Sequence, residues 1–155
     1  MKLETERIIE RSPMPWTILR ATQFHGFVLA LISTLDRLPV MVAPKGFLLQ
    51  PIDIGEVADR TAELALGEAA GRVPDVGGPE VRAFADLARA YFEAAGRRRR
   101  VVEVTVPGKT VRAFREGAQT APGHRYGRIR WEEFLHRAIH QEKGGRDYEG
   151  RSFRG

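Results

Sequence analysis

Hydrophobic and polar positions along the chain follow two periods, one typical of helices and one typical of strands. Apolar residues at helical spacing predict helices over residues 2–11, 23–38, 54–66, 83–95, 109–119 and 131–140. Short apolar or β-branched runs between them predict strands over residues 16–21, 39–43, 47–52, 73–76 and 101–106. Because strands alternate with helices, the pattern predicts an α/β fold with a parallel component.

Prolines, glycines and short polar residues mark where these elements begin and end. The prolines of the segment 12–15 end the first helix, since each disfavours helix in the residue before it. The tripeptide Pro44-Lys45-Gly46 predicts a hairpin turn between the second and third strands. Asp53 is a helix N-cap, and Glu56 completes a capping-box pattern. We expect that helix to end at Gly67 and to present an apolar face made of Val57, Ala58, Ala62, Leu64 and Leu66.

Length and composition are those of one globular domain. The chain has 155 residues, 43% of them hydrophobic and 29% charged. It has no cysteine, which excludes disulfides and thiolate metal sites and fits a cytoplasmic location. No apolar run reaches the roughly 18–20 residues that span a bilayer, and Glu4, Glu6 and Glu10 interrupt any secretory pattern, so we expect no membrane partner. The net charge of +5 permits binding to polyanions without showing it.

Several short motifs, in a consistent order, resemble one known family. Each is weak alone, but their order and spacing over about residues 2–137 make the set specific. With them the chain resembles the NmrA-like branch of the atypical short-chain dehydrogenases/reductases. The motifs are Lys2-Leu3-x-x-Glu6, Ser12, the run from Pro15 to His25, Gln50-Pro51-Ile52-Asp53 with Glu56-Val57-Ala58, Gly77-Gly78-Pro79-Glu80 and Trp131-Glu132-Glu133-Phe134-Leu135.

The resemblance implies a Rossmann-type, doubly wound fold that binds NAD(P), together with a small lobe that faces the substrate. The Gly-rich turn that binds the dinucleotide is missing: residues 67–71 follow a helix, and Gly77-Gly78 has no third glycine before a helix. We therefore expect only the C-terminal half of the fold, over residues 1–142. Glycine and charged residues dominate residues 143–155, which we expect to be a disordered polar tail.

The resemblance also implies roles for five residues. Lys2 lies where the family has the catalytic lysine of its Tyr-x-x-x-Lys pair, which lowers the pKa of the tyrosine that transfers the proton. That tyrosine would precede the first residue, so the pair is incomplete in this chain. Thr22, Gln23 and Phe24 follow the first predicted strand and would contact the nicotinamide. His25 would contact the substrate above the same strand.

Each of these residues also has a purely structural interpretation. For Lys2 we favour the catalytic role in a complete protein and a solvated residue at a chain end in this chain alone. Thr22 is equally a helix N-cap, with Phe24 in the core. His25 is more often a packed or exposed polar residue than a catalytic one. Trp16 and Trp131 are expected in the core.

Two further groups of residues carry weak signals for binding. His136 and His140 have the i, i+4 spacing of a metal pair, but no third ligand is evident, so we predict no metal site. Arg97 to Arg100 lack the aromatic residues and motifs of nucleic-acid-binding proteins, so nucleic acid is not an expected partner. We interpret this run as a solvated turn, with Arg98 and Arg99 as candidate salt-bridge partners.

Two functions follow from these expectations. In the first, the chain is part of an NAD(P)-dependent oxidoreductase or of a redox-sensing NAD(P)-binding protein, for a small-molecule substrate that the sequence leaves open. Alone it would be inactive and bind the cofactor weakly or not at all, because the helix N-terminus that binds the pyrophosphate is missing. A separate polypeptide could supply the N-terminal half. In the second, the chain is a non-catalytic interaction domain, for example a homodimer, that associates through the surface which the missing half would cover.

Overall fold

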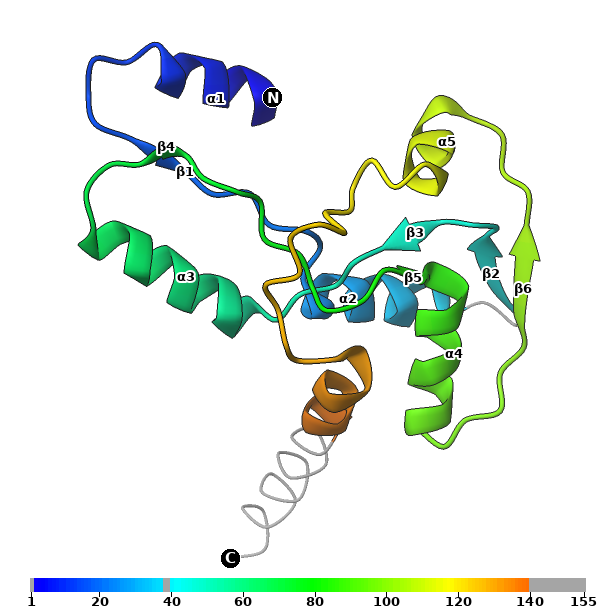
Figure 1. The fold of residues 1–155 in the computed structure, drawn as a ribbon. Helices are drawn as coiled ribbons and strands as arrows, with labels where there is room; N and C mark the ends of the chain where they lie inside the picture. The colour runs from blue at the N-terminus through cyan, green and yellow to red at the C-terminus, as the bar shows by residue number, and fades with distance from the viewer. Residues whose placement is uncertain (1, 38–39, 140–155) are drawn as a thin grey trace, which may run out of the picture.

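The computed structural model describes residues 2–37 and 40–139, except for the side chains of Lys2 and Leu3. Helices and short strands alternate along the chain (Figure 1), which confirms the predicted α/β class. The tail predicted over residues 143–155 lies outside the described residues. The helices are α1 (Lys2–Glu10), α2 (His25–Leu35), α3 (Ile54–Leu66), α4 (Phe84–Ala94), α5 (Lys109–Arg115) and a last helix over residues 131–139. The strands are β1 (Thr17–Ile18), β2 (Met41–Pro44), β3 (Leu48–Leu49), β4 (Gly71–Arg72), β5 (Arg82–Ala83) and β6 (Val101–Val104).

The described strands form three pairs rather than one wide sheet. β1 pairs in parallel with β4, and an isolated bridge between Ala21 and Val76 continues this pairing. β2 pairs in parallel with β6, and β3 pairs antiparallel with β5. The parallel component that the sequence predicts is therefore present in two of the three pairs.

The hairpin predicted between the second and third strands is wrong. The turn itself forms, because the N–H of Phe47 donates to the carbonyl of Pro44 over 3.3 Å and Gly46 adopts a φ of 69°. Beyond the turn, however, the two strands separate: the N–H of Lys45 donates to the carbonyl of Val104 over 2.8 Å, and β3 pairs with β5. Each strand pairs with a segment far away in sequence, which a local pattern does not reveal.

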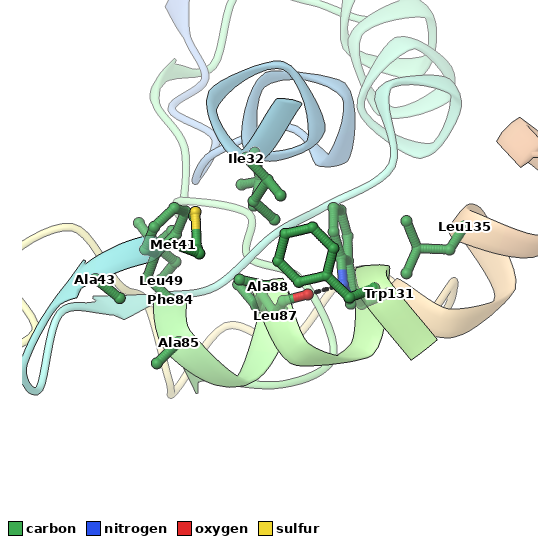
Figure 2. Close-up of a cluster of buried hydrophobic side chains, with 12 residues drawn as sticks. Ile32, Met41, Ala43, Leu49, Phe84, Ala85, Leu87, Ala88, Trp131 and Leu135 are labelled. Carbon is green, nitrogen blue, oxygen red and sulfur yellow. Dashed lines mark hydrogen bonds between the residues drawn. The ribbon is translucent and has the colours of Figure 1, made fainter. Parts of the chain in front are cut away.

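One buried cluster holds together α2, α4, β2, β3 and the last helix (Figure 2). Within it, the indole N–H of Trp131 donates to the carbonyl of Leu87 over 2.9 Å, so the only polar atom of that side chain is satisfied. Trp131 is thus in the core as predicted, whereas Trp16 is only half-buried, beside Gly71. The cluster consists of Val28, Ile32, Met41, Ala43, Leu49, Phe84, Ala85, Leu87, Ala88, Phe92, Trp131 and Leu135.

The part of the molecule around β1 and β4 buries much less apolar surface. α1 and α3 lie on opposite sides of this strand pair (Figure 1), and neither helix has a fully buried side chain among those described. The apolar face predicted for α3 is present in the sequence but is not buried. Val57 and Leu64 are half-buried, Ala58 and Ala62 are exposed, and Leu66 is 91% exposed.

The ends of α3 follow the sequence signals only in part. The carboxylate of Asp53 accepts a hydrogen bond from the N–H of Gly55 over 2.8 Å, and Gly67 occupies the C-cap position, as predicted. The capping box is wrong, because Oε1 of Glu56 accepts instead from the N–H of Arg128, over 2.7 Å. A side chain expected to stabilise its own helix thus holds a distant segment in place.

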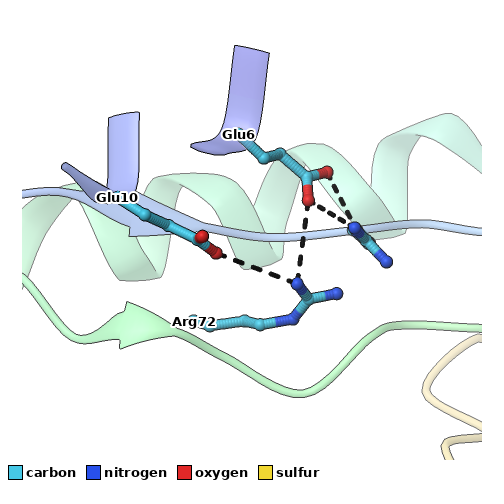
Figure 3. Close-up of polar contacts among 4 residues, drawn as sticks. Glu6, Glu10 and Arg72 are labelled. Carbon is cyan, nitrogen blue, oxygen red and sulfur yellow. Dashed lines mark hydrogen bonds and ion pairs between the residues drawn. The ribbon is translucent and has the colours of Figure 1, made fainter. Parts of the chain in front are cut away.

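Ion pairs, rather than apolar packing, hold α1 beside the β1–β4 pair (Figure 3). The carboxylate of Glu6 accepts two hydrogen bonds from Arg20, one of them from Nε over 2.9 Å. Arg72 Nη1 lies 3.7 Å from Glu6 Oε2 and 4.0 Å from Glu10 Oε1. The hydrogen bond from Arg20 lowers the pKa of Glu6 below its ordinary value.

Candidate functional site

The candidate site lies where the β1–β4 pair ends. The N–H of Thr22 donates to the carbonyl of Val76 over 3.0 Å, after which one segment leads into α2 and the other turns at Gly77-Gly78. Ligands of doubly wound folds bind outside the carboxyl ends of parallel strands. The structure therefore brings the predicted residues 22–25 to the edge where such a ligand would bind.

A fully buried glutamine, Gln50, joins this edge to the loop over residues 117–127. Its Nε2 donates to the carbonyls of Gly78, over 2.8 Å, and Ala121, over 3.3 Å. Its Oε1 accepts from the N–H of Ala121 over 2.7 Å. Both polar atoms of the amide are therefore bonded, as a buried amide requires. Gln50 makes the strand end and the loop one connected unit.

Thr22 and Gln23 use their side chains within the same network. The hydroxyl of Thr22 donates to the carbonyl of Gln50. The amide of Gln23 donates to the carbonyl of Gln119 over 3.0 Å and accepts from the N–H of Gln50 over 3.2 Å. Gln23 thus contacts the loop directly and Thr22 holds the backbone of Gln50, and their predicted contact with the nicotinamide stays a prediction.

The start of α2 differs from the structural interpretation of these residues. Thr22 is not the N-cap, because Phe24 occupies that position, in extended conformation and without a side-chain cap. Phe24 pairs with Ile52 through a parallel bridge and is half-buried. The backbone pairing with Ile52 carries the chain in extended form two residues further than the capping signal suggests, and this sets the first residue of the helix.

His25 is packed between aromatic rings rather than open to solvent. Only 2% of its surface is exposed, and its ring stacks on Phe134 with centroids 5.0 Å apart and lies 5.6 Å from Trp131. Nε2 lies 3.0 Å from the carbonyl of Ile129, to which it donates, while Nδ1 is buried without a hydrogen-bond partner. Burial lowers the pKa of His25 below its ordinary value. This geometry is that of a packed histidine, and its substrate contact stays a prediction.

Lys2 is the first residue of α1, and its side chain lies outside the described part of the chain. Its backbone therefore starts the helix that Glu6 ties to β1. The catalytic role that the resemblance gives to Lys2 stays a prediction.

Gly77 and Gly78, which follow Val76 where the β1–β4 pairing ends, are a site of close packing. A Cβ on Gly78 would overlap the carbonyl of Pro51, and one on Gly77 would lie 2.5 Å from Nε2 of Gln50. On the other side, the N–H of Gly77 donates to the carbonyl of His124 over 2.9 Å. The pair is therefore closely packed against Gln50 and Pro51 and is bonded to the segment at His124.

Gln50 and Glu56 are the residues to which the sequence interpretation gave no role at the site. Glu56 bonds the N–H of Arg128, and His25 bonds the carbonyl of the next residue, Ile129, so together they fix the segment that leads into the last helix. A signal for Gln50 exists in the sequence: it is a lone polar residue between Leu48-Leu49 and Pro51-Ile52. A polar residue in such a run is buried only if its hydrogen bonds are satisfied.

Two arginines of the run, Arg97 and Arg99, form ion pairs within the protein. Arg97 pairs with Asp36, with Nη2 3.3 Å from Oδ1, and Arg99 pairs with the same carboxylate, with Nε 3.0 Å from Oδ1. The predicted salt bridge of Arg99 is confirmed, and Arg97 rather than the exposed Arg98 is the second partner. These pairs join the end of α2 to the turn after α4.

Neither a metal-binding cluster nor a membrane-spanning helix occurs among the described residues. No group of three or more His, Cys, Asp or Glu side chains in that part of the chain could hold a metal ion. His140 lies outside it. None of the described helices is long and apolar enough to cross a membrane.

Comparison with known proteins identifies the fold. No protein-family model matches the chain, and no curated protein matches it in sequence. A dTDP-4-dehydrorhamnose reductase ortholog from Clostridium acetobutylicum is similar in structure, with a TM-score of 0.66 and 17% identity, over 92% of this chain and 54% of that one. A UDP-glucose 4-epimerase from Thermotoga maritima, solved with UDP-glucose, has a TM-score of 0.63 and 18% identity, over 87% and 49%. A dTDP-4-dehydrorhamnose reductase from Bacillus anthracis, solved with NADP, has a TM-score of 0.62 and 15% identity, over 90% and 53%.

These similarities concern the fold alone, because sequence identity is low. The chain spans about half the length of the solved structures it matches. Its class is therefore α/β, consistent with part of a Rossmann-like fold that it shares with these reductases and this epimerase.

Proposed function

We propose that the chain is the substrate-facing part of an NAD(P)-dependent oxidoreductase, or of a redox-sensing NAD(P)-binding protein, of the NmrA-like kind. The observation that carries the proposal is the placement of residues 22–25 at the carboxyl end of the parallel β1–β4 pair. Solved structures that share this partial fold include a reductase crystallised with NADP. The motifs that resemble the NmrA-like branch support the finer assignment.

The residues present do not fit a whole dinucleotide. The Gly77-Gly78 turn is filled by Gln50 and Pro51, so it does not bind a pyrophosphate. The first N–H of α2, from His25, is already bonded to the carbonyl of Ile52 over 3.0 Å. A pyrophosphate site would therefore come from a second part of the protein or from another polypeptide, and the described residues would supply the nicotinamide and substrate side.

In this proposal, the residues at the strand end position the backbone around the ligand and do not react with it. Thr22, Gln23 and Gln50 fix the loop over residues 117–127 beside the edge where the ligand would bind. A small-molecule substrate would then lie between that loop and the cofactor. Lys2 would assist proton transfer only together with a tyrosine supplied from outside the chain.

Calorimetric titration of the purified chain with NADPH and NADH tests the proposal. We expect no binding, or a Kd above about 1 mM, because the pyrophosphate contacts that supply much of the affinity are missing. Binding in the micromolar range would show that the cofactor site is complete in this chain and would contradict the proposal.

A second titration separates an incomplete enzyme from a protein that never binds the cofactor. The codons that precede Met1 in the genome are read and, where they continue the frame, the longer product is expressed and titrated in the same way. The proposal expects a Gly-rich turn and a tyrosine four residues before Lys2 in that product, together with micromolar binding. A longer product that has neither would favour the second candidate, a non-catalytic interaction domain, which the exposed apolar residues around β1 also support.

A further inference from the structure

One edge of β1 is open in the described part of the molecule. The carbonyls of Trp16, Ile18 and Arg20 accept hydrogen bonds from the β4 side, over 3.0, 3.2 and 2.8 Å. Main-chain groups of alternate residues in a strand point to opposite edges. Those of Thr17, Leu19 and Ala21 therefore point away from β4, where no described strand pairs with them. The open stretch ends before Gln23 and His25, whose main chains bond Ile52.

An apolar groove of about 320 Å³ lies beside this edge, between β1 and α3. The residues that line it, among them Trp16, Leu19, Leu64 and Ala65, are all uncharged. Two large apolar residues next in sequence to lining residues are also exposed: Met14 to 70% and Leu66 to 91%. An uncharged groove along an open strand edge is a surface that another chain can cover.

β1 is short, at two residues, but residues 17–21 lack two other features by which strand edges avoid pairing, namely outward-facing charged residues and prolines. Natural edges are usually protected by charged residues, prolines or bulges. In β1 and the extended residues that follow it, the main-chain groups that face outward belong to Thr17, Leu19 and Ala21, none of them charged. The one charged residue of this stretch, Arg20, is turned toward Glu6 on α1 and so does not guard the edge.

We propose that this surface binds a second copy of the chain, with β1 of one copy paired antiparallel to β1 of the other. A two-fold axis, the commonest symmetry of homo-oligomers, brings a strand edge against itself in antiparallel direction. The two marginal two-stranded pairs then become one four-stranded sheet in the order β4, β1, β1, β4. Because the groove carries no charge, it faces its own copy without like-charge repulsion.

The proposal goes beyond the proposed function and concerns the chain as its sequence stands. The alternative occupant of the same edge is a separate dinucleotide-binding polypeptide. In that case the chain would be monomeric when purified alone. The oligomeric state of the purified chain therefore distinguishes the two occupants, and it does so independently of any cofactor titration.

Sedimentation velocity at about 1 to 100 µM tests the proposal, since a dimer of this kind depends on concentration. We expect a dimer at the upper end, weakened about tenfold or more by Leu19→Lys, because a charge on the edge disfavours pairing. The matched control is Val102→Lys, which places the same charge on a strand valine that is 43% exposed in β6. It should leave the dimer unchanged.

Two additional measurements keep the test decisive. Leu19 is half-buried, so circular dichroism melting checks that the variant folds, and Leu66→Lys replaces it if it does not. Hydrogen exchange at Thr17, Leu19 and Ala21 should slow in the dimer. A monomer at every concentration overturns the proposal. A dimer whose affinity is unchanged by both Leu19→Lys and Leu66→Lys also overturns it. The same holds for a dimer in which these three amides exchange as fast as in the monomer.

Discussion

A single buried amide, Gln50, connects the strand end of the candidate site to the loop over residues 117–127. Replacement by leucine, which is similar in size, leaves the N–H of Ala121 and the carbonyl of Gly78 without these partners. We expect the free energy of unfolding to fall by about 2–4 kcal/mol, because each unpaired buried group costs about 1–3 kcal/mol. Urea denaturation measures this, with Gln119→Leu on the exposed loop as the control. Equal effects of the two variants would contradict the role given to Gln50.

Two glycines of this chain should respond oppositely to the same added methyl group. On Gly78 a Cβ would overlap the carbonyl of Pro51, and the backbone there has no flexible side chain that could move aside. We expect Gly78→Ala to lower stability by about 3 kcal/mol or more. Gly26 lies exposed in α2 with nothing within 4 Å, so Gly26→Ala should raise stability by about 0.5–1 kcal/mol. Thermal melts of both variants measure the contrast, and a tolerated Gly78→Ala would show that the turn is not closely packed.

His25 should make stability depend on pH around neutrality. Burial lowers its pKa, so the folded state favours the neutral ring, and the unfolded state binds the proton more readily. Stability is therefore complete above the ordinary pKa of 6.5 and falls as the pH drops from there through the lower pKa of the folded state. Urea midpoints at pH 7.5 and 5.0 measure this loss. The same pair of midpoints in His25→Phe should differ less, and an equal difference would assign the titration to other groups.

At the scale of elements, α1 should be the part most dependent on charge. Glu6 holds it to Arg20 and Arg72, while Ile8 of the same helix is 68% exposed. We expect Glu6→Gln to speed hydrogen exchange within α1 and to leave exchange in α4 unchanged. Because the pKa of Glu6 is lowered, the stabilisation is present above the ordinary value of 4.5 and is lost as the pH falls below it. Exchange that becomes faster throughout the molecule would show that α1 is part of the main cooperative unit.

Sequence signals located elements well where the cause is local. Asp53 and Gly67 delimit α3. Helix α4 ends just before Gly96, which adopts a φ of 66° that favours glycine. Signals failed where a distant segment decides. Pairing with Ile52 delays the start of α2 past Thr22, and pairing with β6 and β5 separates the strands of the expected hairpin. The same holds at the site, where Gln50 matters through residues about 70 positions away.

At the scale of the whole molecule, the two parts of the chain are unequal in packing. The buried cluster joins α2, α4, β2, β3 and the last helix, while α1 and α3 contribute no fully buried side chain among those described. The apolar pattern of α3 predicts a buried face, but the described residues cover this face only in part. The pattern could not say whether a partner for this face lies within the chain, because the periodicity of a helix is the same whichever protein covers it.

This inequality predicts where the stability of the molecule resides. Phe84, which is 1% exposed in α4, fills the buried cluster, and Phe84→Ala should lower the free energy of unfolding by about 3–5 kcal/mol. Leu66→Ala removes a side chain that is 91% exposed and should change it by less than about 0.5 kcal/mol at protein concentrations low enough to keep the chain monomeric. At high concentration the Leu66 variant should become less stable than the parent chain, because association then contributes to stability. Urea denaturation at both concentrations separates packing within one chain from packing between chains, and a Leu66 effect that does not depend on concentration would place that side chain in the fold of the monomer.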